Sequence, residues 1–366
     1  MALKALAAQS TPVAAVREIC VKRLRLPLSK PYKLAFGDVA AFDTLIVEMA
    51  IGDRVGFGEA TILTGYTPET IDQAWSAATQ LRSALAGRRL DSTAGLLGDA
   101  QAGSPFTVSM FKTAIEMAMG HPVLEVGRDA SVPLLFGLNP TDPDEIDREI
   151  DTAARLGYRT LKVKVGFNVA ADLERVRHIQ TSNAGRMTLR IDGNQGYTLA
   201  DAKQFATSVD ATDIELLEQP CHMDDWPALA EVIKVSAVPI MLDESIYGLA
   251  DIERAAGIGA RFVKLKLMKM GSLDELRDGL CRIRALGMNP VLGNGVASDI
   301  GCWMEACVAN GLIENAGEMN GFLRACEAVV SNPLRVEAGA IQLPARYRPD
   351  LDRAKIDQLT VASTGG

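Results

Sequence analysis

From residue 131 onward, short apolar runs alternate with longer segments in which apolar residues recur at helical spacing. Each run is five to seven residues long and is typical of a buried strand. Eight runs follow this pattern: 132–136, 161–165, 187–192, 214–218, 238–243, 262–267, 289–294 and 312–318. Strands that alternate with helices build a parallel sheet, and eight such units predict a (β/α)8 barrel of the TIM type. An open doubly wound sheet is the alternative, but the glycine-rich loop typical of its first strand is absent from the sequence.

The first third of the chain has a different pattern and predicts an α+β domain. Strands are expected at 16–28, 42–50 and 55–59, and helices at 67–86 and 109–119. We therefore expect an α+β capping domain at 1–130 and a barrel domain at 131–322. The segment 323–366 contains a short strand pair followed by polar residues, and we expect it to pack back on the capping domain.

Composition narrows the range of partners. The 366 residues carry a net charge of −8 and no basic run, so nucleic acid is not an expected partner. Since no apolar run approaches the roughly 20 residues that cross a bilayer, no membrane association is expected either. The six cysteines are scattered without a CxxC pair. They indicate reduced thiols in a cytoplasmic protein rather than a disulfide framework or a zinc site.

Three of the predicted strands end in an acidic residue. Glu218 follows Asp192 by 26 residues, and Asp243 follows Glu218 by 25. Because this spacing matches one βα unit, the three carboxylates take equivalent positions on consecutive strands. They meet at the carboxyl end of the barrel, where active sites of this fold lie. Carboxylates this close raise one another's pKa unless a cation lies between them. The set therefore predicts a Mg²⁺ site, with Mn²⁺ as a substitute.

Two other predicted strands carry lysines on one face. Lys162 and Lys164 alternate with apolar residues in LKVKV, and Lys264 and Lys266 do so in FVKLKL. In an eight-stranded ring these two strands lie opposite each other, so a substrate held on the metal has one lysine on each side. A lysine amine can remove the proton α to a carboxylate while the cation stabilises the developing charge. We expect Lys164 and Lys266 to be the acid/base groups and Lys162 to add positive charge near the substrate.

These motifs resemble those of the enolase superfamily, in its muconate lactonizing enzyme subgroup. The motifs are KVK (162–164), DGN (192–194), EQP (218–220), DES (243–245) and KLMKMGS (266–272), and GFGEAT (56–61) with GYTPETI (65–71) resembles the capping domain. The resemblance implies an enolase-type barrel with an α+β cap. It also implies that Asp192, Glu218 and Asp243 bind the metal and that Lys164 and Lys266 are the two bases, a pattern known for enolase-type sites.

Four further residues are expected to support the site. The resemblance implies that Asn194 orients Asp192. It also places Glu318 where lactonizing enzymes carry an acidic residue and dipeptide epimerases carry Asp-x-Asp. Lys264 departs from the family, whose members often have a neutral polar residue there. Asp299, just after the seventh predicted strand, is expected either to contact substrate or to cap the next helix.

The resemblance leaves three reactions open, all of which begin with loss of a proton α to a carboxylate. The preferred interpretation is a racemase or epimerase of an α-substituted carboxylate, such as an N-acyl amino acid or a dipeptide. The alternatives are a muconate-type cycloisomerase and an acid-sugar dehydratase. A non-catalytic relative is disfavoured because the three acids and both bases are present. Phe36 and Tyr66 are candidate lid residues for the pocket, with a packing role as the alternative, and the family analogy implies a homo-oligomer.

Overall fold

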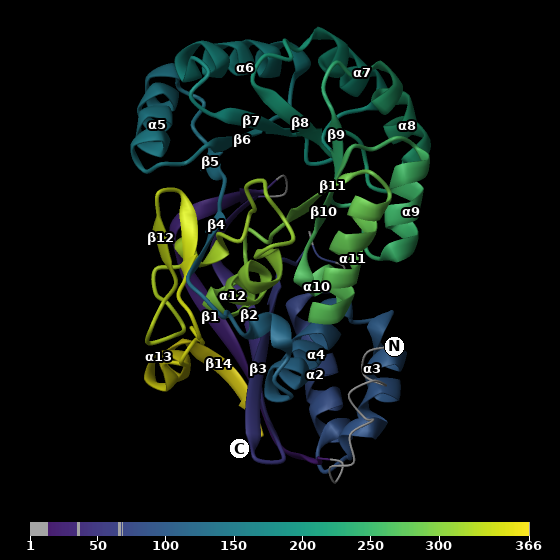
Figure 1. The fold of residues 1–366 in the computed structure, drawn as a ribbon, viewed down its shortest axis with the longest axis vertical. Helices are drawn as coiled ribbons and strands as arrows, with labels where there is room; N and C mark the ends of the chain where they lie inside the picture. The colour runs from purple at the N-terminus through teal and green to yellow at the C-terminus, as the bar shows by residue number, and fades with distance from the viewer. Residues whose placement is uncertain (1–13, 35–36, 65–66, 68, 366) are drawn as a thin grey trace.

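The computed structural model describes residues 14–34, 37–64, 67 and 69–365. Its largest sheet has seven parallel strands in the order β11-β10-β9-β8-β7-β6-β5. These strands are β5 (Phe136–Leu138), β6 (Thr160–Lys164), β7 (Thr188–Asp192), β8 (Ile214–Glu218), β9 (Ile240–Leu242), β10 (Phe262–Leu265) and β11 (Asn289–Leu292). Helices lie along the outside of the sheet, as the teal and green ribbons of Figure 1 show.

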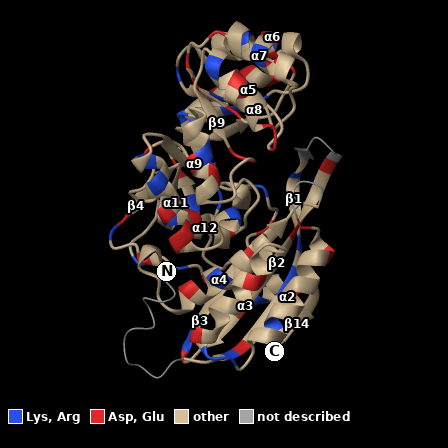
Figure 2. Ribbon diagram, turned by 90° about the vertical axis from the view of Figure 1, so that its right-hand side faces the viewer, with Lys and Arg blue, Asp and Glu red and all other residues tan. Residues whose placement is uncertain are grey.

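The helices that follow these strands repeat the βα unit. They are α5 (Pro143–Arg155), α6 (Val169–Asn183), α7 (Leu199–Ser208), α8 (Trp226–Val235), α9 (Leu249–Gly257), α10 (Leu267–Met270), α11 (Leu273–Ala285) and α12 (Asp299–Ala309). Most of these helices have a polar residue at the N-cap, such as Asn168 and Ser272, whose side chains accept a backbone N–H. Basic and acidic residues are interspersed on α5, α6 and α11 (Figure 2).

The first and last predicted barrel strands are partly wrong. The run 132–136 is divided, because β4 (Ala130–Pro133) pairs antiparallel with β13 (Ala340–Leu343) and β5 begins only at Phe136. The described residues of the run 312–318 form no extended strand, since Asn and Gly have low strand propensity. Gly317 nevertheless bridges Leu134 in parallel. The Glu318 N–H donates to the Leu292 carbonyl at 2.9 Å, so this segment is hydrogen-bonded on both sides.

The capping sheet contains four strands in the order β14-β1-β2-β3. They are β1 (Val16–Leu34), β2 (Gly37–Ile51), β3 (Arg54–Ile62) and β14 (Thr360–Thr364), which lie beside the helices α2 (Ile71–Leu85), α3 (Thr93–Gln101) and α4 (Pro105–Ala118). The short elements η2 (Leu90–Ser92), η3 (Pro122–Leu124), η4 (Gly321–Leu323), β12 (Arg335–Glu337) and α13 (Arg353–Leu359) fill the connections. The yellow C-terminal strand β14 lies alongside the purple strand β1 (Figure 1).

Strand alternation separates two kinds of core. Apolar side chains such as Leu161, Val163 and Leu189 pack in a large buried cluster with residues of the surrounding helices. Leu216, Met241 and Val291 form a separate small cluster, together with the half-buried Phe262. Leu216 lies on β8 and Phe262 on β10, while Met241 and Val291 lie on β9 and β11. Because side chains alternate along a strand, Leu216 is on the same face of β8 as Glu218, and Phe262 is on the same face of β10 as Lys264. Inside the barrel, charged side chains such as Glu218 and Lys264 therefore lie on the carboxyl side of a thin apolar layer.

Two glutamates of the cap bind the amino ends of barrel helices. Glu116 of α4 accepts the backbone N–H groups of Leu273 (2.8 Å) and Asp274 (3.2 Å) at the start of α11. Glu59 of β3 accepts the N–H of Ser298 at 2.8 Å, at the N-cap of α12. A carboxylate is stabilised at a helix N-terminus. These contacts therefore fasten the cap to the carboxyl end of the barrel.

Candidate active site

The carboxyl ends of the central strands bring the three predicted acids together. Lys164 lies opposite Asp192 in the β6–β7 pair, and Asp192 lies opposite Glu218 in the β7–β8 pair. Asp243 follows β9 by one residue. All three carboxylates are almost fully removed from solvent. Three acids buried in this way need positive partners, because an unpaired buried charge is strongly unfavourable.

Lys164 and Lys266 lie on opposite flanks of the acids. The Lys164 Nζ is 2.7 Å from Asp192 Oδ2, and the Lys266 Nζ is 2.8 Å from Asp243 Oδ2. Their strands β6 and β10 are separated in the sheet by β7, β8 and β9. Lys164 keeps 34% of its side chain exposed and Lys266 keeps 13%, whereas the acids between them are buried. The two amines therefore border the site from two directions.

Lys162 and Lys264 form a deeper pair. The Lys162 Nζ lies 2.8 Å from Asp192, 3.0 Å from Glu218 and 2.9 Å from Glu318. The Lys264 Nζ lies 3.0 Å from Glu218 Oε1 and 3.3 Å from Asp243 Oδ2, and it also contacts Glu318. Both lysines are buried. The structure thus brings Lys264 and Glu318 into direct contact, which the sequence analysis did not foresee.

The lysines change the expected effect of carboxylate repulsion. Burial opposes ionisation of Asp192, but the ammonium groups of Lys162 and Lys164 lower its pKa to about 2. Burial also opposes ionisation of Asp243, yet Lys266 holds its pKa well below the usual value. Glu218 alone follows the expectation, because burial and the neighbouring Asp192 raise its pKa to about 7. Nearby lysines therefore stabilise the ionised forms of Asp192 and Asp243 but leave the pKa of Glu218 raised.

Lys162 and Lys266 remain charged for the same reason. Burial favours the neutral amine of Lys162, but Asp192, Glu218 and Glu318 outweigh it and raise the pKa well above its ordinary value. Asp243 likewise outweighs burial and raises the pKa of Lys266. The ammonium form of Lys266 is consequently the form that its ion pair stabilises.

The loops that carry the acids are held by close backbone contacts. Gly166, two residues after the end of β6, has φ +100°, and a Cβ there would lie 2.4 Å from the Gly193 carbonyl oxygen. Gln219 accepts the N–H of Asp243 at 3.0 Å and donates to Ser245 Oγ at 2.8 Å. The Gly193 N–H also donates to the Glu218 carbonyl at 2.9 Å, so hydrogen bonds of Gly193 and Gln219 join the DGN, EQP and DES motifs.

We expect Gly166→Ala to destabilise the protein by about 1–3 kcal/mol, because alanine is strained at this φ and its Cβ meets backbone. The measurement is the free energy of unfolding in urea. Gly98→Ala is the matched control, because a Cβ added to this helical glycine of α3 would meet no heavy atom within 4 Å. It should gain up to about 1 kcal/mol from helix propensity. Equal stability of Gly166→Ala and the wild type would contradict the steric argument.

Asn194 and Asp299, two residues expected to support the site, lie in different surroundings. The Asn194 N–H donates to Asp192 Oδ1 at 2.9 Å, and its side chain contacts both Lys164 and Glu244. The structure does not bring Asp299 to the other site residues. Asp299 begins α12, and the N-cap is Ser298, so the capping role is wrong. Burial raises the pKa of Asp299, and backbone groups of Val329 and Leu334 in the C-terminal segment oppose this rise.

Lys269 is a member of the site that the sequence analysis left out. It lies on the one-turn helix α10, three residues after Lys266, which places both on one side of the turn. Its Nζ donates to the Asp243 carbonyl at 2.6 Å and lies 4.3 Å from the ring centroid of Tyr247. The K-x-x-K spacing was the available signal. Phe36 and Tyr66, the expected lid residues, lie outside the described residues.

A buried glutamate also lies behind Lys266. Glu305 of α12 accepts the Leu267 N–H at 2.9 Å, while its Oε2 is buried without a hydrogen-bond partner in the described part of the chain. Burial raises the pKa of Glu305 to about 8. The unfolded chain loses this proton near pH 4.5, so the folded protein binds more protons between pH 4.5 and 8. Stability contributed by this group therefore falls as pH rises through that window.

We expect Glu305→Gln to flatten the pH dependence of stability. Relative to the variant, the wild type should lose up to about 1.4 kcal/mol of unfolding free energy per pH unit between about pH 5 and 8. Urea unfolding of both proteins at about pH 5.5, 6.5 and 7.5 measures the difference. Because other buried acids titrate equally in both proteins, the difference isolates Glu305. Parallel pH profiles would show that this carboxyl is already ionised in the folded state.

The donor set suits a hard divalent cation. Asp192, Glu218 and Asp243 offer only oxygen, and carboxylate oxygens are the ligands that Mg²⁺ prefers. Asp243 Oδ1 is buried and accepts no hydrogen bond from the described residues. The Lys269 Nζ lies 3.6 Å from this oxygen. A buried acceptor oxygen without a hydrogen-bond donor of its own is available to a metal ion.

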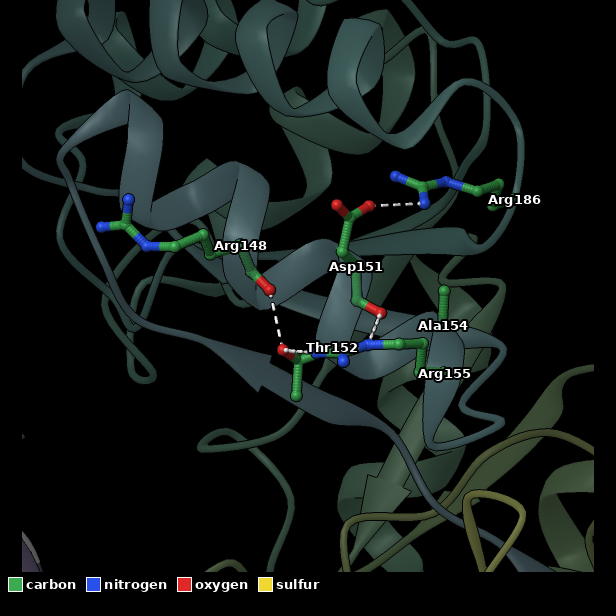
Figure 3. A pocket seen from close by; sticks show the side chains of 6 residues that line it. All are labelled: Arg148, Asp151, Thr152, Ala154, Arg155 and Arg186. Atoms are coloured by element: carbon green, nitrogen blue, oxygen red, sulfur yellow. Dashed lines mark hydrogen bonds and ion pairs between the residues drawn. The ribbon is translucent and has the colours of Figure 1, made fainter.

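Two other features are less suited to chemistry. Glu116, His121 and Asp274 bring ligand-type atoms within 4.8 Å of one another. Glu116 there binds backbone N–H groups, and His121 Nε2 is 3.1 Å from Asp274 Oδ1, so these atoms join cap and barrel. A hollow of about 700 Å³ is lined by residues of α5 and by Arg186. Figure 3 shows these side chains. The arginines of this hollow are exposed, and Arg186 is paired with Asp151 at 2.7 Å.

Comparison with known proteins decides the family. Residues 145–349 match the family model described as "Enolase C-terminal domain-like". The chain belongs to the enolase superfamily. This match covers every strand from β6 to β11 and all the acids and lysines of the site.

Two curated relatives place this enolase-superfamily member among isomerases, and one solved structure supports its fold. It is 28% identical to the L-Ala-D/L-Glu epimerase of Bacillus subtilis, over 76% of this chain and 80% of that protein. It is 26% identical to the N-succinyl-L-Arg/Lys racemase of Bacillus cereus, over 76% of this chain and 79% of that protein. The structure is a dipeptide epimerase from Cytophaga hutchinsonii complexed with Mg and D-Ala-L-Val. Its TM-score is 0.84 and its identity 21%, over 96% of this chain and 99% of that one. That likeness supports the barrel-and-cap fold.

The remaining expectations concern location. Among the described helices, none is both long and apolar enough to cross a lipid bilayer.

Proposed function

We propose that this protein is a divalent-cation-dependent racemase or epimerase that acts at the carbon α to a carboxylate. The observation that carries the proposal is the placement of Lys164 and Lys266, each 2.7–2.8 Å from an outer carboxylate on opposite flanks of one acidic cluster. A reaction that inverts a carbon needs one group to take a proton on one face and another to give a proton on the other. This pair of amines supplies both.

Each residue then has a defined part. Asp192, Glu218 and Asp243 are proposed to hold Mg²⁺, or Mn²⁺ in its place. A bound cation supplies positive charge for the substrate carboxylate as the α-proton leaves. One lysine, as an amine, takes the α-proton onto its Nζ, and the C–H electron pair passes into the carboxylate to form an enediolate. The other lysine, as an ammonium, returns a proton to the opposite face. Lys162 remains charged and adds positive potential beneath the site.

The substrate is proposed to be an α-substituted carboxylate whose α-nitrogen is part of an amide. The relatives support this class, because one is named for a dipeptide and another for N-succinyl amino acids. Amide substitution removes the ammonium charge that would otherwise lie beside the lysines. N-acyl amino acids and dipeptides both meet this requirement.

We also infer that residues 316–318 act as the eighth member of a closed ring. Gly317 donates to the Pro133 carbonyl at 2.8 Å and Glu318 to the Leu292 carbonyl at 2.9 Å. These bonds support closure between β11 and the chain leading into β5. Closure matters for the site, because it brings Glu318 to the lysines of β6 and β10.

The experiment that tests the function is incubation in D₂O with Mg²⁺ and a pooled set of N-acyl amino acids, dipeptides and other α-substituted acids. Mass spectrometry should find one deuterium at the α-carbon, with chiral chromatography showing both configurations. Chelation by EDTA should stop the exchange. Label that appears only in a lactone or a dehydrated product would instead assign the protein to the cycloisomerases or dehydratases.

A further inference from the structure

Four charged side chains form one layer inside the barrel. They are Lys162 on β6, Glu218 at the end of β8, Lys264 on β10 and Glu318 from the closing segment, and all are buried. Their elements alternate around the ring, with β7, β9 and β11 between them. Layers of four side chains from alternate strands usually fill such barrels with bulky apolar groups. Here the layer alternates a base and an acid.

Each ammonium in the layer touches both glutamates. Lys162 lies 3.0 Å from Glu218 and 2.9 Å from Glu318. Lys264 lies 3.0 Å from Glu218 and is in contact with Glu318. The four groups thus close a ring of ion pairs with two positive and two negative charges. Glu318 is the acid of this ring that is not a proposed metal ligand.

Both lysines also compete for the proposed ligand oxygens. Lys162 lies 2.8 Å from Asp192, and Lys264 lies 3.3 Å from Asp243. A cation on these acids would take over the carboxylate oxygens that now balance the ammonium groups. Two buried ammonium groups would then lie beside a divalent cation, and like charges at a few ångströms in a buried site repel strongly. Glu318 is the carboxylate in the ring that could still hold them.

Building on the proposed function, we propose that Glu318 is the internal counter-ion that retains Lys162 and Lys264 when a divalent cation binds to Asp192, Glu218 and Asp243. Glu318 is thus a positioning residue whose partners are lysines. Lys264 adds an ammonium group to the site, and Glu318 adds a carboxylate. The carboxylate of Glu318 therefore offsets the repulsion between the Lys264 ammonium and a bound cation. The pair should therefore be coupled in cation binding.

The backbone around Glu318 supports a fixed position. Its N–H donates a hydrogen bond to the Leu292 carbonyl. A Cβ at position 293 would lie 2.5 Å from the Glu318 backbone, so only glycine fits at this position. Burial alone would raise the pKa of Glu318, but Lys162 and Lys264 hold it well below the usual value. A rigid, ionised acid between two ammonium groups suits a counter-ion.

The test is isothermal titration of Mg²⁺, and separately Mn²⁺, into the wild type, Glu318→Gln, Lys264→Gln and the double variant. Glu318→Gln should weaken cation binding about 10–100-fold, the usual effect of losing a partner that orients a metal site. Lys264→Gln should bind at least as tightly as the wild type. The double variant should recover most of the loss. Thermal unfolding of each protein checks that it is folded.

The outcomes separate two hypotheses. A wild type that binds neither cation would overturn the proposed function itself. A wild type that binds, together with unchanged affinity in Glu318→Gln or no recovery in the double variant, would overturn only the counter-ion role. If Glu318→Gln does not fold, Lys264→Gln decides alone, since weaker binding in that variant contradicts the proposal. Lost turnover in Glu318→Gln with unchanged cation affinity would assign Glu318 to the substrate and also overturn it.

Discussion

Lys164→Ala should lose α-proton exchange from one enantiomer of the substrate by about 10²–10⁴-fold and keep exchange from the other. Lys266→Ala should show the reverse selectivity. The magnitude is that of removing a positioned acid/base group. The selectivity follows from geometry, because the two amines border the acids from β6 and from the end of β10. Each lysine can therefore reach only one face of a substrate bound between them.

The measurement is deuterium incorporation from D₂O into each pure enantiomer, followed by mass spectrometry. Lys203→Ala is the control, since this lysine lies on α7 and 40% of its side chain is exposed. It should exchange both enantiomers at the wild-type rate. Equal loss for both enantiomers in either active-site variant would show that one lysine serves both faces, or that the substitution disturbs the site as a whole.

Asp243→Asn should weaken Mg²⁺ binding by more than about 100-fold, beyond the effect expected for residues that only orient a ligand. Asp243 is buried among Lys264, Lys266 and Lys269, so its negative charge offsets much of their repulsion toward a cation. An amide keeps the shape and removes that charge. Turnover at moderate Mg²⁺ should fall at least as far as binding does.

The control for Asp243→Asn comes from the second cluster of ligand-type atoms. Asp274→Asn changes a carboxylate that lies with Glu116 and His121 at the junction of cap and barrel. It should leave Mg²⁺ affinity within about twofold of the wild type by titration calorimetry. A large loss in Asp274→Asn and a small one in Asp243→Asn would move the cation site from the strand ends to that junction.

The sequence predicted the elements whose pattern is regular. The alternation of Lys162 and Lys164 with apolar residues placed both on one strand face, and the strand-end acids lie at or directly after the ends of β7, β8 and β9. Regular alternation works here because each barrel strand buries one face on helices and directs the other inward. The division of 132–136 between β4 and β5 could not be foreseen, because residues 132–133 pair with β13, which comes much later in the sequence.

The electrostatic partners inside the site were harder to predict. Repulsion among the acids was expected, whereas the structure neutralises Asp192 and Asp243 with lysines from other strands. Which lysine meets which acid depends on barrel closure and on long, flexible side chains, and neither is visible in local sequence. Asp299 shows the same limit: its position after a strand suggested the site, but α12 turns its carboxyl toward the C-terminal segment.

The pairing of β14 with β1 has a consequence for how the protein is made. Val21 pairs with Thr364, so one sheet joins segments from nearly opposite ends of the sequence. During synthesis β1 emerges early and waits, with one edge unpaired, until the whole barrel has left the ribosome. Exposed strand edges promote association between chains, and contacts this distant slow folding. Newly made molecules should therefore be most prone to aggregate, and most dependent on chaperones, in the interval before the final strand docks.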